Sequence, residues 1–167
     1  MPDIGRMLLH GGALSLLASL FLLACLLLRP RLLLQDYPDA IQSVVPPKTD
    51  DERRMTLVVG IPFLVLLLFF PVWSSWTLPM HDGHAASFGA LFVNTFVVAS
   101  TFNVFDWLVL DWLLVCTLTP RFLVIPGTEG MRAYKDYAFH FRGFVIGTGL
   151  SLALALVTAT IVRIVRP

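Results

Sequence analysis

The sequence predicts an all-α integral membrane protein, a four-helix bundle made of four transmembrane helices. Of its 167 residues, 57% are hydrophobic and only 14% are charged, and the mean hydropathy is +0.80. Ordinary soluble domains do not have this composition. The apolar residues also gather into four segments, each long enough for a span that needs about 20 helical residues. The basic residues concentrate in two of the connecting loops.

The spans are expected near 7–28, 55–76, 87–118 and 139–162, in one transmembrane domain over residues 1–167. The first should end at Arg29, where a charge meets Pro30. The letters "LLAC" at 22–25 are similar to a lipoprotein cleavage site. Because the apolar run continues beyond that cysteine to Leu28, we interpret the segment as a true span.

The second helix is expected to begin before the membrane. Thr49 and Glu52 have the spacing of a capping box, in which each side chain bonds the other residue's backbone N–H. Pro62 should kink this helix, and Trp73 and Trp76 indicate an interfacial aromatic belt at its far end.

Orientation follows from the basic residues, nine of twelve of which fall on one side of the predicted membrane. They are Arg29, Arg31, Lys48, Arg53, Arg54, Arg121, Arg132, Lys135 and Arg142. The positive-inside rule makes the loops at about 29–54 and 119–138 cytoplasmic and both termini external. We therefore expect a bacterial plasma (inner) membrane protein.

Small residues recur at every fourth position in the fourth and first spans, a pattern typical of closely packed membrane helices. They are Gly143, Gly147, Ser151, Ala155 and Ala159, and Gly11, Ser15 and Ser19. The pattern predicts that these two spans are neighbours, with self-association through the same surface, or a ligand cleft, as alternatives.

Two carboxylates, Asp106 and Asp111, lie inside the third span, where an acid usually faces protein or water and has a partner. On a straight α-helix, residues five apart point about 140° from each other, which predicts that these two do not meet. Asp111 is expected to pair with Arg142. Asp106 should bond Asn103 or Thr148, or be protonated.

The entry to the fourth span, "YKDYAFHFR" at 134–142, mixes cations with aromatic rings as an interfacial anchor or a lipid head-group site would. We therefore take as candidate head-group or ligand-binding residues Asn103, Lys135, Tyr137 and Arg142. The candidate catalytic residues are Asp106, Asp111 and His140.

We expect no cofactor, no metal and no nucleic acid. "HDGH" at 81–84 lacks a further zinc ligand nearby and favours a solvated turn. His10 and His140 fall at opposite membrane faces, so they cannot jointly ligate a haem.

The segment "FNVFD" at 102–106 is similar to the FNVAD segment of lipoprotein signal peptidases, which are also four-span proteins with two intramembrane aspartates. Asn103 and Asp106 match its Asn and Asp. The family's other aspartate, in a segment like GNLIDR, has no counterpart here, and the match lies in the third span instead of the last. We infer no peptidase activity from these five residues.

Two hypotheses for function follow. The first is a non-enzymatic accessory or assembly subunit, or a small homo-oligomer, which in one form has a transport role that uses Asp106. Its expected partners are membrane lipids, together with further copies of the chain or a larger membrane complex. The second is an enzyme acting on a lipid or isoprenoid at the cytoplasmic interface through Asp106, Asp111, His140 and Arg142. The enzyme predicts a cavity lined by at least three of these side chains, and the packing protein predicts a paired Asp111 and no cavity.

Overall fold

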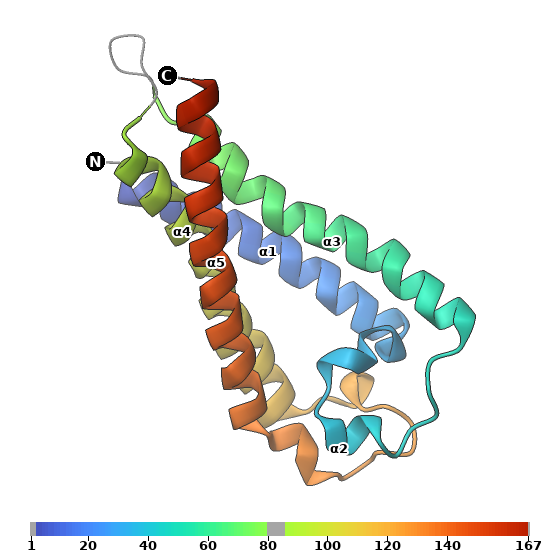
Figure 1. Ribbon diagram of the computed structural model, residues 1–167. Coiled ribbons are helices and arrows are strands. Elements are labelled where there is room, and N and C mark those ends of the chain that lie inside the picture. Colours follow the sequence, from blue (N-terminus) through green and yellow to red (C-terminus); the bar gives the residue numbers. More distant parts are fainter. Residues whose placement is uncertain (1–2, 80–85, 167) are drawn as a thin grey trace.

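The computed structural model describes residues 3–79 and 86–166. This part contains four helices long and apolar enough to cross a membrane and no strand. They are α1 (Ile4–Leu28), α3 (Asp50–Trp76), α4 (Phe88–Phe105) continued by the π-helix η2 (Asp106–Leu118), and α5 (Tyr137–Val165). The predicted fold class is confirmed, and each of the four predicted spans coincides with one of these helices. The start of α1 and the end of α5 lie at the same end of the bundle (Figure 1).

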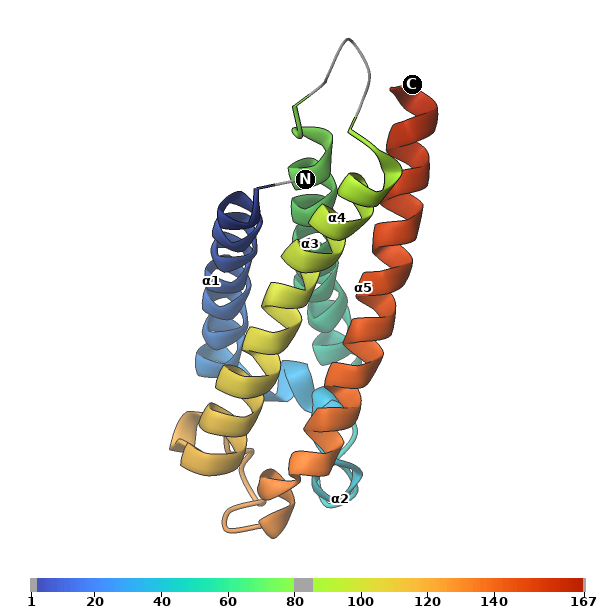
Figure 2. The ribbon, with the colours of Figure 1, turned by 90° about the vertical axis from the view of Figure 1, so that its left-hand side faces the viewer.

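The four helices form two pairs that meet at one end of the bundle and separate toward the other. In Figure 1, α1 and α3 diverge from α4 and α5 on the way down from the end that carries the termini. Figure 2 shows α4 between α1 and α5, and α4 packs against both. The molecule is therefore a wedge whose wide end is the end away from the termini.

Polar side chains fix the helix ends locally. The Thr49 hydroxyl accepts a hydrogen bond from Glu52 N at 3.2 Å and the Glu52 carboxylate accepts one from Thr49 N at 2.9 Å, so the predicted capping box is confirmed. Asp136 caps α5 through Phe139 N. Helix α3 continues through Pro62 as one element.

The small-residue surface of α5 packs on α4 from Gly147 onward, and the prediction that it packs on α1 is wrong. A Cβ on Gly147 would overlap the Asn103 side chain, and a Cβ on Gly11 would lie 2.5 Å from Thr101 Cβ. Both partners belong to the span that contains α4, because α4 lies between the other two helices. Small residues on α1 and α5 thus let one central helix approach closely on both sides.

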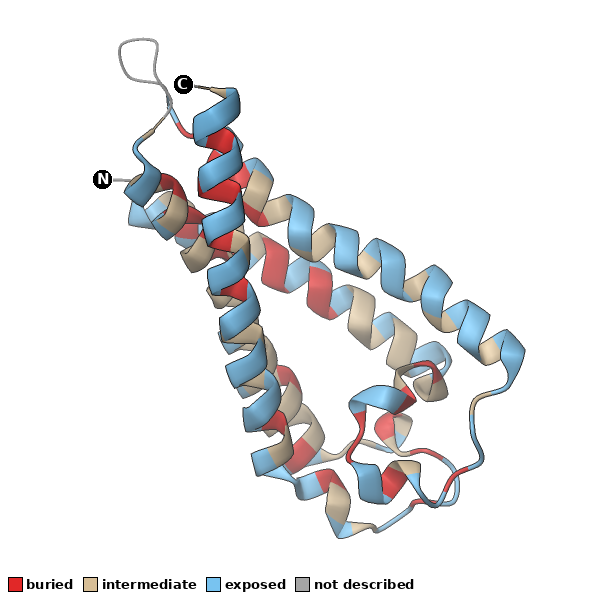
Figure 3. Ribbon diagram, in the orientation of Figure 1, coloured by how far each residue is buried: buried red, intermediate tan, exposed pale blue. Residues whose placement is uncertain are grey.

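The two long loops fold together into a cap across the wide end. The first contains η1 (Pro30–Asp36) and α2 (Asp39–Gln42), and the second contains η3 (Arg121–Leu123) and η4 (Arg132–Lys135). Their buried apolar cluster consists of Leu34, Tyr37, Ile41, Val45, Ile125 and Tyr134. Figure 3 shows buried positions in this cap, below the long helices.

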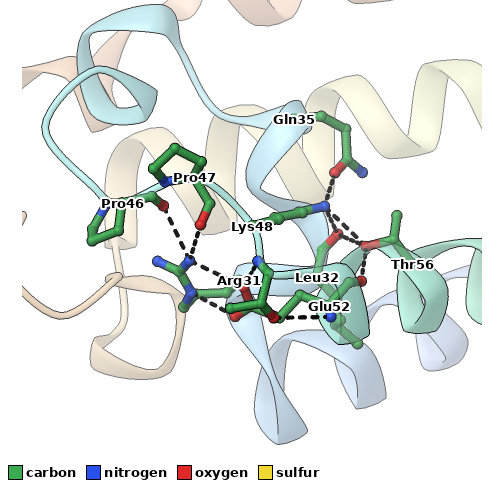
Figure 4. Close-up of polar contacts among 9 residues, drawn as sticks. Arg31, Leu32, Gln35, Pro46, Pro47, Lys48, Glu52 and Thr56 are labelled. Carbon is green, nitrogen blue, oxygen red and sulfur yellow. Dashed lines mark hydrogen bonds and ion pairs between the residues drawn. The ribbon is translucent and has the colours of Figure 1, made fainter.

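Helix α3 is held mainly at its two ends. At the cap, Arg31 Nε lies 2.7 Å from Glu52 Oε1, and Lys48 Nζ donates to Thr56 Oγ1 at 3.0 Å (Figure 4). At the other end, Ser75 Oγ lies 2.7 Å from Thr95 Oγ1 of α4. Before Pro71 the helix buries no residue. Its middle is therefore the most weakly packed part of the bundle.

Candidate functional site

A cavity of about 640 Å³ lies between the two helix pairs, next to the cap. Three apolar clusters pack the rest of the molecule, one around Leu91 near the termini, one around Leu14 and one in the cap. The last two share residues with the cavity wall. Leucine and aromatic side chains from all four spans form most of the wall. The ionisable lining residues are Asp36, Tyr37, Asp39, Asp106, Asp111, His140 and Arg142.

The π-helix brings the two intramembrane acids to the same cavity. The third span changes from α-helix to π-helix at Asp106, and its bonding pattern is seen where Thr119 N donates to Leu114 O. With bonds from i to i+5, residue i+5 follows roughly one turn after residue i. Asp106 and Asp111 therefore both line the cavity and interact electrostatically. The angle of about 140° expected between them assumed α-helical geometry, which does not apply to this segment. No hydrogen bond joins the two side chains in the described part of the chain.

Asp111 pairs with His140 and not, as predicted, with Arg142. The Asp111 Oδ1 atom lies 3.0 Å from His140 Nδ1, and His140 is 6% exposed. His140 lies on the first turn of α5, with its ring facing η2, whereas Arg142 is exposed and lines the cavity. A carboxylate at Nδ1 favours the tautomer with the proton there, which leaves Nε2 as an acceptor.

Asp106 makes no hydrogen bond or ion pair to another described residue. The two partners predicted for it bond to each other, since Asn103 Nδ2 donates to Thr148 Oγ1 at 3.0 Å and to Phe144 O at 3.0 Å. Asn103 therefore ties α4 to α5 at the cavity wall. Asp106 remains beside the cavity with a partly exposed side chain.

Asp36, at the end of η1, is a lining residue that sequence reasoning missed. Its side chain is accessible from the cavity, yet protein surrounds it on most sides, and this desolvation raises its pKa. The negative charge of Asp111 raises the same pKa, and Lys48 and a hydrogen bond from Gln35 oppose the rise. In the sequence Asp36 is one of several acids in a polar loop, so nothing distinguished it before the cap was known.

Two polar atoms of lining residues are buried without a hydrogen-bond partner, His140 Nε2 and Trp107 Nε1. A buried group left unpaired costs roughly 1–3 kcal/mol. His140 can accept a hydrogen bond through Nε2, and Trp107 Nε1 can only donate one.

The other candidate residues lie elsewhere. The structure puts Lys135 and Tyr137 outside the cavity wall, and the Tyr137 hydroxyl lies 3.1 Å from Thr117 Oγ1. His81 and His84 lie outside the described residues. Within residues 3–79 and 86–166, no three His, Cys, Asp or Glu side chains are grouped to hold a metal ion. His10 instead bonds Ser74 Oγ at 2.8 Å near the far end of the bundle.

The arrangement is suited to proton transfer beside an apolar chain. It combines an imidazole oriented by a carboxylate, a second carboxylate without a partner and a wall that is mostly hydrocarbon. Comparison with protein-family models, curated proteins and solved structures finds no match to this chain.

Proposed function

We propose that this integral membrane protein is an enzyme that binds an amphiphilic lipid or isoprenoid in the cavity and acts on it by acid–base chemistry. The observation that supports this most is the lining itself. Asp106, Asp111, His140 and Arg142 line one cavity, as the enzyme hypothesis requires. The subunit hypothesis relied on a free small-residue surface, and within this chain α4 already occupies that surface from Gly147 onward.

In the proposed mechanism, His140 is the general base. Asp111 holds the proton on Nδ1 and stabilises the imidazolium that forms when Nε2 takes a proton from the substrate or from water. Asp106 supplies a second carboxyl group for proton return or for stabilising positive charge. No serine, threonine or cysteine lines the cavity in the described part of the chain, so a covalent intermediate on such a residue is not part of the proposal.

The charge distribution supports a site near the cytoplasmic interface. The loops that build the cap carry most of the basic residues, and the positive-inside rule directs them to the cytoplasm of a bacterial inner membrane. The head of a bound amphiphile would then lie at the inner leaflet, with its chain in the hydrocarbon.

Gly143 and Gly149 offer a matched test, because both lie on α5 and neither has an atom within 4 Å of the position of a Cβ. Only Gly143 lines the cavity. The wild type, Gly143→Leu and Gly149→Leu would be reconstituted with a bacterial lipid extract and the lipids compared by mass spectrometry. We expect the wild type and Gly149→Leu to convert at least one lipid, and Gly143→Leu to convert none.

Asp111→Asn should remove the same conversion, since it takes away the charge that supports the imidazolium. If the wild type left the extract unchanged, or if Gly143→Leu converted the same lipid at the wild-type rate, the enzyme proposal would be wrong. If an Asp106→Asn variant kept full cellular function, Asp106 would have no role in the mechanism.

A further inference from the structure

The cavity wall carries far more negative than positive charge. Its described lining holds four carboxylates, from Asp36, Asp39, Asp106 and Asp111, and one permanent cation, Arg142. Charges interact strongly where water is scarce, so this wall repels an anionic head group and attracts a cationic one. A phosphate placed here would face acids from both the π-helix and the cap.

The carboxylates in the wall also call for a hydrogen-bond donor. Asp106 has no partner among the described residues and Asp36 accepts a hydrogen bond from Gln35, so both can accept a further one from a ligand. An amine or a hydroxyl group satisfies these acceptors. A phosphate at neutral pH offers mainly acceptors and leaves the carboxylates unsatisfied.

One side of the cavity lies between α3 and α5. These two helices diverge toward the cap (Figure 1), and both contribute to the wall, α3 through Phe63 and Leu67 and α5 through Gly143 and Ile146. Ile146 lines the cavity and is nevertheless 65% exposed, so it lies at the rim. The cap covers the wide end, and on the opposite side α1 still contacts η2 and η3.

A smaller cavity of about 220 Å³ adjoins the first, lined by Cys25 of α1 and by Val59 and Gly60 of α3. Both cavities share five lining residues, namely Leu22, Leu33, Gln35, Asp36 and Phe63. This adjacent space is apolar on most sides and can hold part of a hydrocarbon chain whose head lies at the carboxylates.

From the charge of the cavity wall and its carboxylate acceptors, we infer that the ligand is an amphiphile with an amine or hydroxyl head and no phosphate. It enters from the bilayer through the side of the cavity between α3 and α5. This inference rests on the proposed function and narrows its substrate class. The ligand's chain would lie against Phe63 and Leu67, and its head beside Asp106 and Asp111.

Selectivity can be measured with three probes that share one chain and differ in the head, namely hexadecylamine, monopalmitoylglycerol and hexadecyl phosphate. Binding to the purified full-length protein would be followed by native mass spectrometry. We expect the amine or the glycerol ester to bind at least about tenfold more tightly than the phosphate. Asp106→Asn combined with Asp111→Asn should reduce that preference, while Asp51→Asn, an exposed acid outside the cavity, should keep it.

Access can be tested with a photoactivatable hexadecylamine in vesicles. We expect crosslinked peptides from α3 and α5 near Phe63 and Ile146. Ile146→Trp should slow binding several-fold, and Leu150→Trp, 66% exposed on the same helix but outside the wall, should not.

Equal or tighter binding of hexadecyl phosphate would overturn the inferred head group, and crosslinks confined to the cap would overturn the inferred entry. Neither result would contradict the proposed function, because these assays measure binding without turnover. Failure of lipid conversion in the reconstituted system would instead contradict the proposed enzymatic function, and the measured binding selectivity would still hold.

Discussion

At the scale of single residues, the site depends on which partner each polar group finds. Asp111 bonds His140 because both lie near the cap end of adjacent helices, and Asn103 bonds α5 instead of Asp106. The sequence identified these four residues as candidates, since a polar side chain in an apolar span has a reason to be there. It could not assign their partners, because those depend on the local rotation of each helix.

Asp111→Asn should lower the rate of lipid conversion by at least about a hundredfold, the range typical of a lost acid–base contribution. The amide can no longer stabilise an imidazolium at His140. Initial rates at saturating lipid would measure the loss, and Asp111→Glu should recover part of it. Wild-type rates in Asp111→Asn would show that the pair is structural.

Asp36→Asn should raise the midpoint of thermal unfolding at pH 8. Burial raises the Asp36 pKa in the folded state, so above that pKa the fold carries a desolvated charge that the unfolded chain solvates. Below the ordinary carboxyl pKa, Asp36 is protonated in both states and the advantage of Asn should vanish.

Light-scattering or fluorescence melts between pH 3.5 and pH 8, a range chosen around the ordinary carboxyl pKa of about 3.9, would trace this dependence. Asp51→Asn, at the exposed start of α3, is the control. A benefit that grew as the pH fell would contradict the predicted sign.

At the scale of elements, the sequence predicted the spans well and the internal geometry of one of them poorly. Long apolar runs and the Thr49–Glu52 capping box located the helices to within a few residues. Hydrophobic pattern does not distinguish an α-helix from a π-helix when nearly every position is apolar, as in "DWLVLDWLLVCTL". The relation between Asp106 and Asp111 was therefore beyond sequence reasoning.

Gly147→Ala should lower the thermal midpoint by roughly 2–10 °C, as expected for overpacking that costs about 1–3 kcal/mol. The added methyl group would overlap Asn103, which ties α4 to α5. Gly149→Ala, with open space at its Cβ, is the matched control and should leave the midpoint nearly unchanged. An equal effect of both substitutions would show that helix propensity, not this contact, determines the result.

At the scale of the whole molecule, the wedge shape combines rigid and weakly held parts. The narrow end is joined by buried polar contacts, including Asn94 Nδ2 to Ser74 Oγ and to Ser75 Oγ, both at 2.9 Å. The wide end is closed only by loops. Composition predicted a bundle, but the spacing of the helix pairs follows from contacts between distant residues that no local pattern encodes.

Membrane orientation can be tested by labelling with an impermeant maleimide, after replacing Cys25 and Cys116 by serine. Arg132→Cys in the cap and Pro79→Cys at the opposite end are both exposed positions. In right-side-out vesicles we expect labelling at position 79 and none at 132, and in inverted vesicles the reverse. The opposite pattern would place the cap outside.

The cap also determines when the protein can finish folding. The Tyr37 hydroxyl donates to Leu123 O at 2.8 Å, across 86 positions of the chain, and His140 comes later still. During synthesis, the ribosome delivers Asp106 and Asp111 to the membrane before the imidazole that receives Asp111 has been made. For that interval the third helix carries two unpaired acids, so we expect the nascent chain to keep this segment near water or the insertion machinery until α5 arrives.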